Sequence, residues 1–182
     1  MHPVELTGPR VSWRELAQGD AEAIVDLMSD ERVFRYALDT EMPDVAVYRA
    51  FLSEYADTVT AADRTRYKLA LTLDGRVIGT GGLEMRQASA TYGEIGYMLH
   101  SDTWGKGLGT EAAALLVGFA FDQLKLHRVW AGADPGNVAS TRILEKIGMR
   151  HEGTHREDTF KDGAWRDSAV YAILETDPRP FG

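Results

Sequence analysis

Three glycines at alternate positions, Gly105, Gly107 and Gly109, separate a strand-like run from a long apolar, helix-like run. Glycine has no Cβ, so the backbone N–H groups of such a loop can surround an anion closely. The helix that follows adds N–H groups without intrahelical acceptors and the positive end of its dipole. This spacing predicts a site for phosphate groups, and a pyrophosphate is the ligand that we expect there.

Two common nucleotide-binding patterns fail at named positions. A P-loop reads G-x-x-x-x-G-K-[ST], but His100 stands at its first glycine and Gly107 at its Ser or Thr. A dinucleotide fingerprint reads G-x-G-x-x-G, but Thr110 stands at its third glycine. A plain turn without a ligand is the alternative that the loop alone leaves open.

A third pattern fits this loop. Residues 104–112, WGKGLGTEA, resemble the acetyl-CoA loop of the GNAT N-acetyltransferase superfamily, usually written Q/R-x-x-G-x-G/A. Trp104 replaces the usual Gln or Arg, as is common in the RimJ/RimL branch, which often reads W-G-x-G-x-x-T-E-A.

A second segment, residues 137–153, resembles the GNAT pattern N-x-x-[AS]-x-x-x-x-x-K-x-G-F-x-x-E-G, with Met149 for the usual Phe. The resemblance extends from about residue 10 to the C-terminus and is specific over residues 94–153. It implies an N-acetyltransferase with acetyl-CoA as cosubstrate, and the order of the two segments agrees with that family.

The resemblance also implies which residues contact coenzyme A. They are Met98, Leu99, Trp104, Gly105, Lys106, Gly107, Leu108, Gly109, Thr110, Asn137 and Ser140. Three of them have a structural alternative: Trp104 can pack at the mouth of the loop, Asn137 can cap a helix, and Ser140 can be an ordinary surface hydroxyl.

Acetyl transfer to an amine requires a positioned thioester, a polarised carbonyl, a deprotonated amine and a stabilised thiolate leaving group. The family implies direct attack, with a backbone N–H of the coenzyme strand, beside a bulge, polarising the carbonyl. Glu94 on that strand is our first candidate for the base, although it can instead face solvent or form a cross-strand pair. Glu157 and Asp158 on the penultimate strand are second candidates.

The proton donor to the thiolate needs a different residue from the one that many GNAT enzymes use. Those enzymes have a Tyr on the helix that follows the Asn, and Leu144 occupies that position here. The RimJ/RimL branch often has Ser at the position of Ser140, so we expect Ser140 to serve as the acid.

Composition limits the function classes. The chain has 182 residues, 44% of them hydrophobic, no cysteine and a net charge of −8. We expect one domain, residues 1–182, in the cytoplasm, without a membrane span or signal peptide. The absence of cysteine excludes disulfides, thiolate metal sites and a cysteine nucleophile, and no histidine pattern indicates a metal.

The acidic balance argues against binding nucleic acid through a basic surface. It favours a cationic amine as the second substrate, although a surface kept acidic for solubility explains it equally well. Lys106 and the loop N–H groups act on an anion at contact range, whereas distant carboxylates are screened within about 8–10 Å.

Periodicity predicts a mixed α/β sheet. The expected strands are 10–16, 66–73, 76–85, 91–99, 128–133, 149–160 and 165–174, and the expected helices are 21–28, 31–36, 43–60, 112–126 and 137–147. This is the order of the GNAT fold, which adds a mostly antiparallel sheet, flanked by helices, that splays after the strand before the glycine loop.

Local signals refine these elements. Asp20 and Asn137 are expected N-caps, and Gly148 is an expected residue just after a helix. Two Asp-Gly pairs, at 74–75 and 162–163, predict hairpins. We expect Gly79, Gly81 and Gly82 to mark a bulge or close backbone approach, and Gly118 to mark close helix packing.

Two other functions share these motifs: a non-catalytic acyl-CoA-binding module and an enzyme that uses another donor such as succinyl-CoA. The acceptor is expected on the helical region 19–63 and the last hairpin, where no motif is readable. The branch favours a protein N-terminal amine or a related primary amine, and a homodimer is common in the family.

Overall fold

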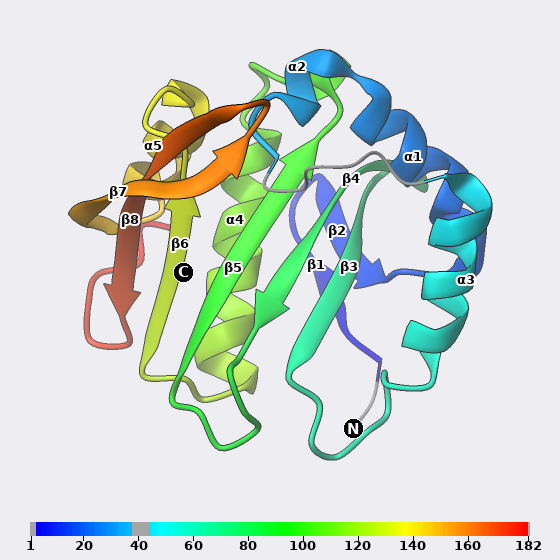
Figure 1. Cartoon of the computed structure of the whole chain (residues 1–182). Coiled ribbons are helices and arrows are strands. Elements are labelled where there is room, and N and C mark those ends of the chain that lie inside the picture. Colours follow the sequence, from blue (N-terminus) through cyan, green and yellow to red (C-terminus); the bar gives the residue numbers. More distant parts are fainter. Residues whose placement is uncertain (1–2, 38–43, 182) are drawn as a thin grey trace.

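The computed structural model describes residues 3–37 and 44–181. Eight strands form one sheet in the order β1-β2-β3-β4-β5-β6-β8-β7 (Figure 1). The strands are β1 (Glu5–Thr7), β2 (Val11–Glu15), β3 (Arg66–Leu73), β4 (Arg76–Glu84), β5 (Tyr92–Leu99), β6 (Arg128–Ala133), β7 (Arg150–Lys161) and β8 (Ala164–Leu174). The helices are α1 (Ala21–Ser29), α2 (Glu31–Phe34), α3 (Val45–Ala56), α4 (Leu108–Gly118) and α5 (Val138–Lys146).

The sheet opens between β5 and β6. These strands are parallel and pair only at Tyr92 with Arg128, Gly93 with Val129 and Glu94 with Trp130. Figure 1 shows them diverging from the end where both strands begin toward the end where α2 lies. All other neighbouring strands pair antiparallel. The expected splay is confirmed, and it places an opening directly before the glycine loop.

The two faces of the sheet have different partners. The buried residues of α4, among them Leu108, Ala112 and Leu116, join Ile95 and Leu99 of β5 in the main core cluster. Helices α1 and α3 bury Ile24 and Leu52 in a second cluster with Ala70 of β3. Alternate residues of a strand point to opposite faces, so β5 presents its odd-numbered side chains to α4 and its even-numbered ones to the other face.

Most strands lie within a residue or two of their expected bounds, but three elements differ. The helix expected at 43–60 ends at Ala56. β1 was not expected, because only Leu6 of its three residues is buried and so no alternation is readable. The helix expected at 112–126 begins at Leu108 and continues as a π-helical turn over Phe119–Gln123. The continuous apolar run begins only at Ala112, so the sequence placed the start of the helix there. Gly109 therefore lies inside the helix and not in the loop. Pro43, the expected start of α3, lies outside the described residues.

Several of the local signals are confirmed. Both Asp-Gly hairpins have positive φ at both residues, and Gly148 has φ +96°. A Cβ on Gly79 would lie 2.4 Å from the Met98 carbonyl oxygen, and one on Gly82 would lie 1.6 Å from that of Tyr67. β4 therefore needs these glycines to approach its neighbours.

Two local expectations were wrong. Asp20 accepts no N–H from the helix that it precedes, because its carboxylate binds the Arg14 guanidinium and the Ala17 N–H instead. Gly118 is not closely packed: a Cβ there would meet only the Asp122 carboxylate, at 3.7 Å. None of the described helices is long and apolar enough to span a membrane.

Candidate active site

The glycine loop joins β5 to α4 at the wide end of the opening. Gly105 and Gly107 have φ of +75° and +76°, and Gly107 is the residue directly before α4. Because an α-helix leaves its first N–H groups without intrahelical acceptors, those of Leu108, Gly109 and Thr110 are available to an anion. Two left-handed glycines followed by a helix start have the backbone geometry that the predicted anion cradle requires.

Arg10 and Glu111 hold this loop in place. Glu111, in the first turn of α4, accepts the Arg10 N–H at 2.7 Å, the Val11 N–H at 3.0 Å and the Arg10 Nε at 2.8 Å. Burial alone would raise the pKa of Glu111, but these donors outweigh it and lower the pKa. Glu111 is therefore ionised at neutral pH and ties the start of β2 to the loop.

Arg10 also orients one peptide of the loop. Its Nη1 donates to the Lys106 carbonyl oxygen at 2.8 Å, and none of the described peptide bonds is cis. In a trans peptide the C=O and the following N–H point in opposite directions. Because the Lys106 C=O points toward Arg10, the Gly107 N–H points away from Arg10.

We expect Arg10→Gln to weaken the binding of coenzyme A by about tenfold, since it removes charge-assisted hydrogen bonds worth roughly 1–2 kcal/mol. Turnover at saturating acetyl-CoA should stay within about twofold of the wild type, because Arg10 positions the loop and not the acceptor. Isothermal titration of coenzyme A and the two kinetic constants measure these effects.

Arg150→Gln is the matched control for Arg10→Gln. The Arg150–Asp177 pair has side-chain exposures of 72% and 14%, against 50% and 11% for Arg10–Glu111, but Arg150 lies on β7. An Arg10 variant that binds coenzyme A as tightly as the Arg150 variant would show that this contact does not position the loop.

The backbone N–H and C=O groups of Tyr97 and Leu99 lie on the edge of β5 that faces the opening. The Met98 carbonyl oxygen faces β4, as its closeness to Gly79 shows, and the His100 N–H donates to Ile78 of β4. On the other edge, the Thr91 carbonyl accepts N–H groups from His127 and Arg128 on the β6 side. Because the backbone groups of successive residues alternate between edges, those of Tyr97 and Leu99 face the opening.

This geometry corrects the expectation that the backbone of Met98 contacts the coenzyme. The expected bulge in this strand is also absent: β4 and β5 pair without a register shift from Gly79–Leu99 to Glu84–Glu94. The irregularity lies one strand away, where β3 and β4 slip between Leu71 and Thr72.

Trp104 and Lys106 make local contacts. The Trp104 indole N–H donates to the Leu99 carbonyl oxygen at 2.9 Å while the side chain stays 46% exposed. Lys106 Nζ donates to the Asp102 carbonyl oxygen at 2.9 Å. Trp104 therefore packs at the junction of strand and loop, as its structural alternative predicts. Because its indole N–H occupies the Leu99 carbonyl oxygen, only the Leu99 N–H remains available on the edge that faces the opening.

Asn137 and Ser140 lie at the start of α5. Asn137 Oδ1 accepts the Ser140 N–H at 3.2 Å, so the expected N-cap is confirmed. The Ser140 hydroxyl lies 3.5 Å from the Tyr97 hydroxyl across the opening. Leu144 is 1% exposed and places an apolar side chain where many relatives of this pattern have a tyrosine.

Tyr97 and Arg10 border the candidate site, although no sequence motif singles them out. The sequence places Tyr97 in the expected strand 91–99, and its alternation with Ile95 and Leu99 indicates that it faces the helix side. For Arg10 no sequence signal existed, because its partner Glu111 lies 101 positions away.

Glu94 lies at the apex of the opening, in the last residue pair between β5 and β6. Its half-buried side chain is on the even-numbered face of β5, opposite the face of Tyr97. Burial, and next the nearby negative charge of Glu84, raise the pKa of Glu94. Glu84 is its register partner across β4 and β5, so the cross-strand neighbour is also a carboxylate.

Glu157 and Asp158 lie away from this apex. Both are exposed on β7, and β8 lies between β7 and β6 in the sheet. Asp158 pairs with His155 at 3.8 Å. The structure does not bring either carboxylate next to Glu94. Among the described residues, no group of three or more His, Asp and Glu side chains could hold a metal ion.

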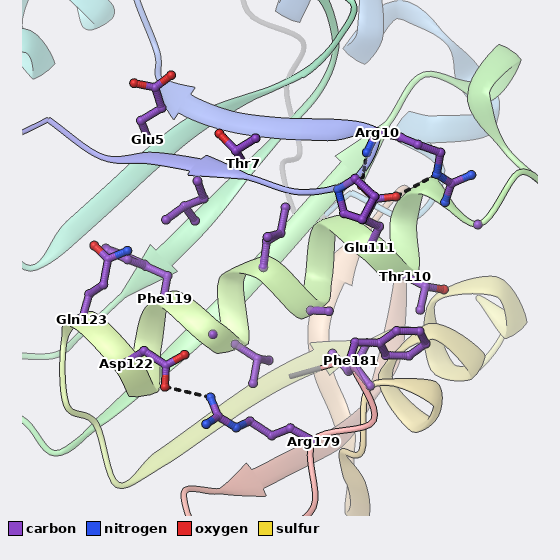
Figure 2. Close-up of a pocket in the computed structure, with 18 residues that line it drawn as sticks. Glu5, Thr7, Arg10, Thr110, Glu111, Phe119, Asp122, Gln123, Arg179 and Phe181 are labelled. Atoms are coloured by element: carbon purple, nitrogen blue, oxygen red, sulfur yellow. Dashed lines mark hydrogen bonds and ion pairs between the residues drawn. The ribbon is translucent and has the colours of Figure 1, made fainter.

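A separate cavity of about 640 Å³ lies along the outer face of α4. Figure 2 shows Glu5 and Thr7 of β1 on one side and Arg179 and Phe181 of the C-terminal segment on the other, with the Arg10–Glu111 pair at one end. This cavity borders Gly107 and Thr110 but lies on the far side of α4 from the β5–β6 opening, so we call it the outer groove.

Comparisons with known proteins agree with this geometry. Residues 10–150 match the acetyltransferase (GNAT) domain. The chain is 35% identical over 177 residues to the "Probable N-acetyltransferase YjcK" of Bacillus subtilis (strain 168), covering 94% of this chain and 98% of that relative. It is 30% identical over 86 residues to the ribosomal protein uS5-alanine N-acetyltransferase of Escherichia coli (strain K12), which is 47% of this chain and 44% of that relative.

A solved structure shows a similar fold over most of the chain. Mycobacterium smegmatis RimJ in complex with CoA-disulfide superposes with a TM-score of 0.82 at 25% identity. The match covers 96% of this chain and 90% of that chain.

Proposed function

The chain belongs to the GNAT family of acetyltransferases, and from that premise we propose that it transfers an acetyl group from acetyl-CoA to a primary amine by direct attack. The observation that carries this proposal is the opening between β5 and β6, with the glycine loop at its wide end and Glu94 at its apex. The structure of M. smegmatis RimJ with CoA-disulfide supports coenzyme A as the ligand.

The chain's residues fit the coenzyme through backbone donors. Gly105, Gly107 and the first turn of α4 would hold the pyrophosphate, and the edge groups of Tyr97 and the Leu99 N–H would hold the pantetheine and acyl carbonyl. Lys106 adds a positive charge at the loop. Asn137 and Ser140 would border the coenzyme at the start of α5.

The two faces of β5 separate the two halves of the chemistry. Glu94 lies on one face, where it would take a proton from the incoming ammonium group. The hydroxyl groups of Tyr97 and Ser140 lie on the other face, beside the expected position of the coenzyme sulfur. The amine nitrogen attacks the carbonyl carbon between them, the C–S bond breaks, and its electron pair leaves with sulfur. Because the opening holds both reactants close together, the attack becomes effectively intramolecular, which lowers the barrier considerably.

We propose a protein N-terminal amine or a related primary amine as the acceptor. The partial match to the uS5-alanine N-acetyltransferase of E. coli supports a protein N-terminus. The net charge of −8 is consistent with attraction of a cationic acceptor.

A panel of amines tests the proposal. Purified protein is incubated with acetyl-CoA and N-terminal peptides, polyamines, aminoglycosides or small amines, and free thiol and product mass are measured together. We expect thiol release in step with one added acetyl group on at least one primary amine. Coenzyme binding without release against every amine would instead support a non-catalytic module, and faster release from succinyl-CoA would support another donor.

The pH dependence should report on Glu94. Only ionised Glu94 accepts a proton, so kcat/KM should fall as pH drops through its raised pKa. Glu84→Gln removes a negative charge and frees Arg66, which pairs with Glu84 at 3.0 Å. Both changes favour ionised Glu94, so the acid limb should move to lower pH. An unmoved limb in a pH–rate profile would show that Glu94 is not the group that titrates.

A further inference from the structure

Tyr97 occupies a special place on β5. It lies three residues beyond Glu94, the last residue that pairs with β6, and therefore beside the open part of the sheet. Its ring packs against the core cluster under α4, which fixes the direction of the side chain toward α5. Tyr97 thus reaches the opening from the strand, where Leu144 on α5 cannot offer a polar group.

The Tyr97 hydroxyl has a partner but also spare hydrogen-bonding capacity. Its contact with the Ser140 hydroxyl is 3.5 Å, longer than the roughly 2.7–2.8 Å typical of O–H···O hydrogen bonds. Each hydroxyl carries one donor and two acceptor lone pairs. If one hydroxyl donates to the other, the second hydroxyl still has its own O–H to donate to an acceptor atom beside the pair.

We propose that the Tyr97 hydroxyl, supported by Ser140, donates a hydrogen bond to the coenzyme sulfur while the acyl–sulfur bond breaks. This inference rests on the proposed acetyl transfer and adds a residue to it. As the C–S bond breaks, its electron pair stays on sulfur, and the thiolate accepts the Tyr97 O–H as a hydrogen bond. Water protonates the thiolate after the acetyl group has moved to nitrogen.

The chemistry of the two hydroxyls favours Tyr97 over Ser140 as the direct donor. A phenol is a stronger acid than an aliphatic alcohol and so donates a stronger hydrogen bond to an anion. Burial raises the pKa of Tyr97 to about 12, against the opposing effect of the Ser140 hydroxyl, so the phenol keeps its proton at neutral pH. Ser140 then orients the phenol and acts as a positioning residue.

The test uses the full chain with Tyr97→Phe, which removes the hydroxyl and keeps the ring. We expect kcat to fall about 10–100-fold, the loss of one hydrogen bond to a charged group, with the KM for acetyl-CoA within about twofold. Tyr171→Phe is the matched control, because Tyr171 lies on β8 and its hydroxyl interacts with Glu145 and Thr141 of α5. That variant should leave both constants near the wild type.

A second readout does not depend on any acceptor amine. The pKa of the thiol of bound coenzyme A, followed by thiolate absorbance, should rise by about one to two units in Tyr97→Phe and stay unchanged in Tyr171→Phe. If no amine is acetylated, the proposed transfer fails but this titration still tests Tyr97. A Tyr97→Phe variant with wild-type thiol pKa would overturn the inference.

The pairing with Ser140 is tested by a double-mutant cycle. If both hydroxyls act on the sulfur as one unit, Tyr97→Phe/Ser140→Ala should lose little more activity than Tyr97→Phe alone. If the thiol pKa of bound coenzyme A rises in Ser140→Ala but does not change in Tyr97→Phe, the sulfur contact belongs to Ser140. That result would overturn the inference.

Discussion

Glu94→Gln is expected to lower kcat/KM for the amine by about 10²–10⁴, the usual contribution of a positioned general base. Glutamine keeps the size of the side chain at the apex of the opening but cannot take a proton from ammonium. The KM for acetyl-CoA should change little, because Glu94 lies on the face of β5 opposite Tyr97 and away from the loop. Steady-state kinetics with each substrate varied in turn measure both constants.

Glu84→Gln is the control for Glu94→Gln, because it changes the register partner in the same way. Its kcat/KM should remain near the wild type at a pH above the acid limb. The loss in Glu94→Gln should also shrink at high pH, where the free amine is abundant and needs no base. A Glu94→Gln enzyme with wild-type kcat/KM at neutral pH would remove Glu94 from the mechanism.

Replacing Gly105 and Gly107 together by alanine is expected to raise the Kd for coenzyme A by about 30–1000-fold. Each position has φ near +75°, where a Cβ costs roughly 1–2 kcal/mol. The exposed loop can relieve this strain by rotating its peptides, and rotation turns the N–H groups away from the phosphates. The expected cost is therefore about 2–4 kcal/mol of binding energy, measured by isothermal titration.

Gly75→Ala/Gly163→Ala is the matched control, since these glycines have φ of +79° and +75° and no atom within 4 Å of an added Cβ. They lie in the two Asp-Gly hairpins, so the same backbone strain should lower stability without changing the Kd. Equal Kd values for the two double variants would mean that the loop does not bind the coenzyme.

The sequence predicts the parts of this site whose geometry is local. The spacing of Gly105 and Gly107 predicts a loop that only glycine adopts easily, and Asn137 predicts a cap that forms with residues three positions on. Strand alternation likewise predicts most of the sheet. These features depend on neighbours in the chain, so periodicity and turn chemistry suffice to find them.

The remaining features depend on pairing between distant segments. Which edge of β5 faces the opening depends on where β4 pairs, and this pairing turns the backbone groups of Tyr97 and Leu99, not those of Met98, toward the opening. The contact of Tyr97 with Ser140 and that of Arg10 with Glu111 need the register of the whole sheet. Asp20 shows the same effect on a smaller scale, because Arg14 on the neighbouring strand competes for its carboxylate.

Amide hydrogen exchange with and without acetyl-CoA tests most directly whether the coenzyme occupies the β5–β6 opening. We expect slower exchange at the N–H groups of Leu99, Gly105, Gly107 and the first turn of α4, and at Ser140, with no change along the outer groove. Protection of Thr7, Phe119 and Phe181 along that groove, with the glycine loop exchanging as in the free protein, would contradict the account.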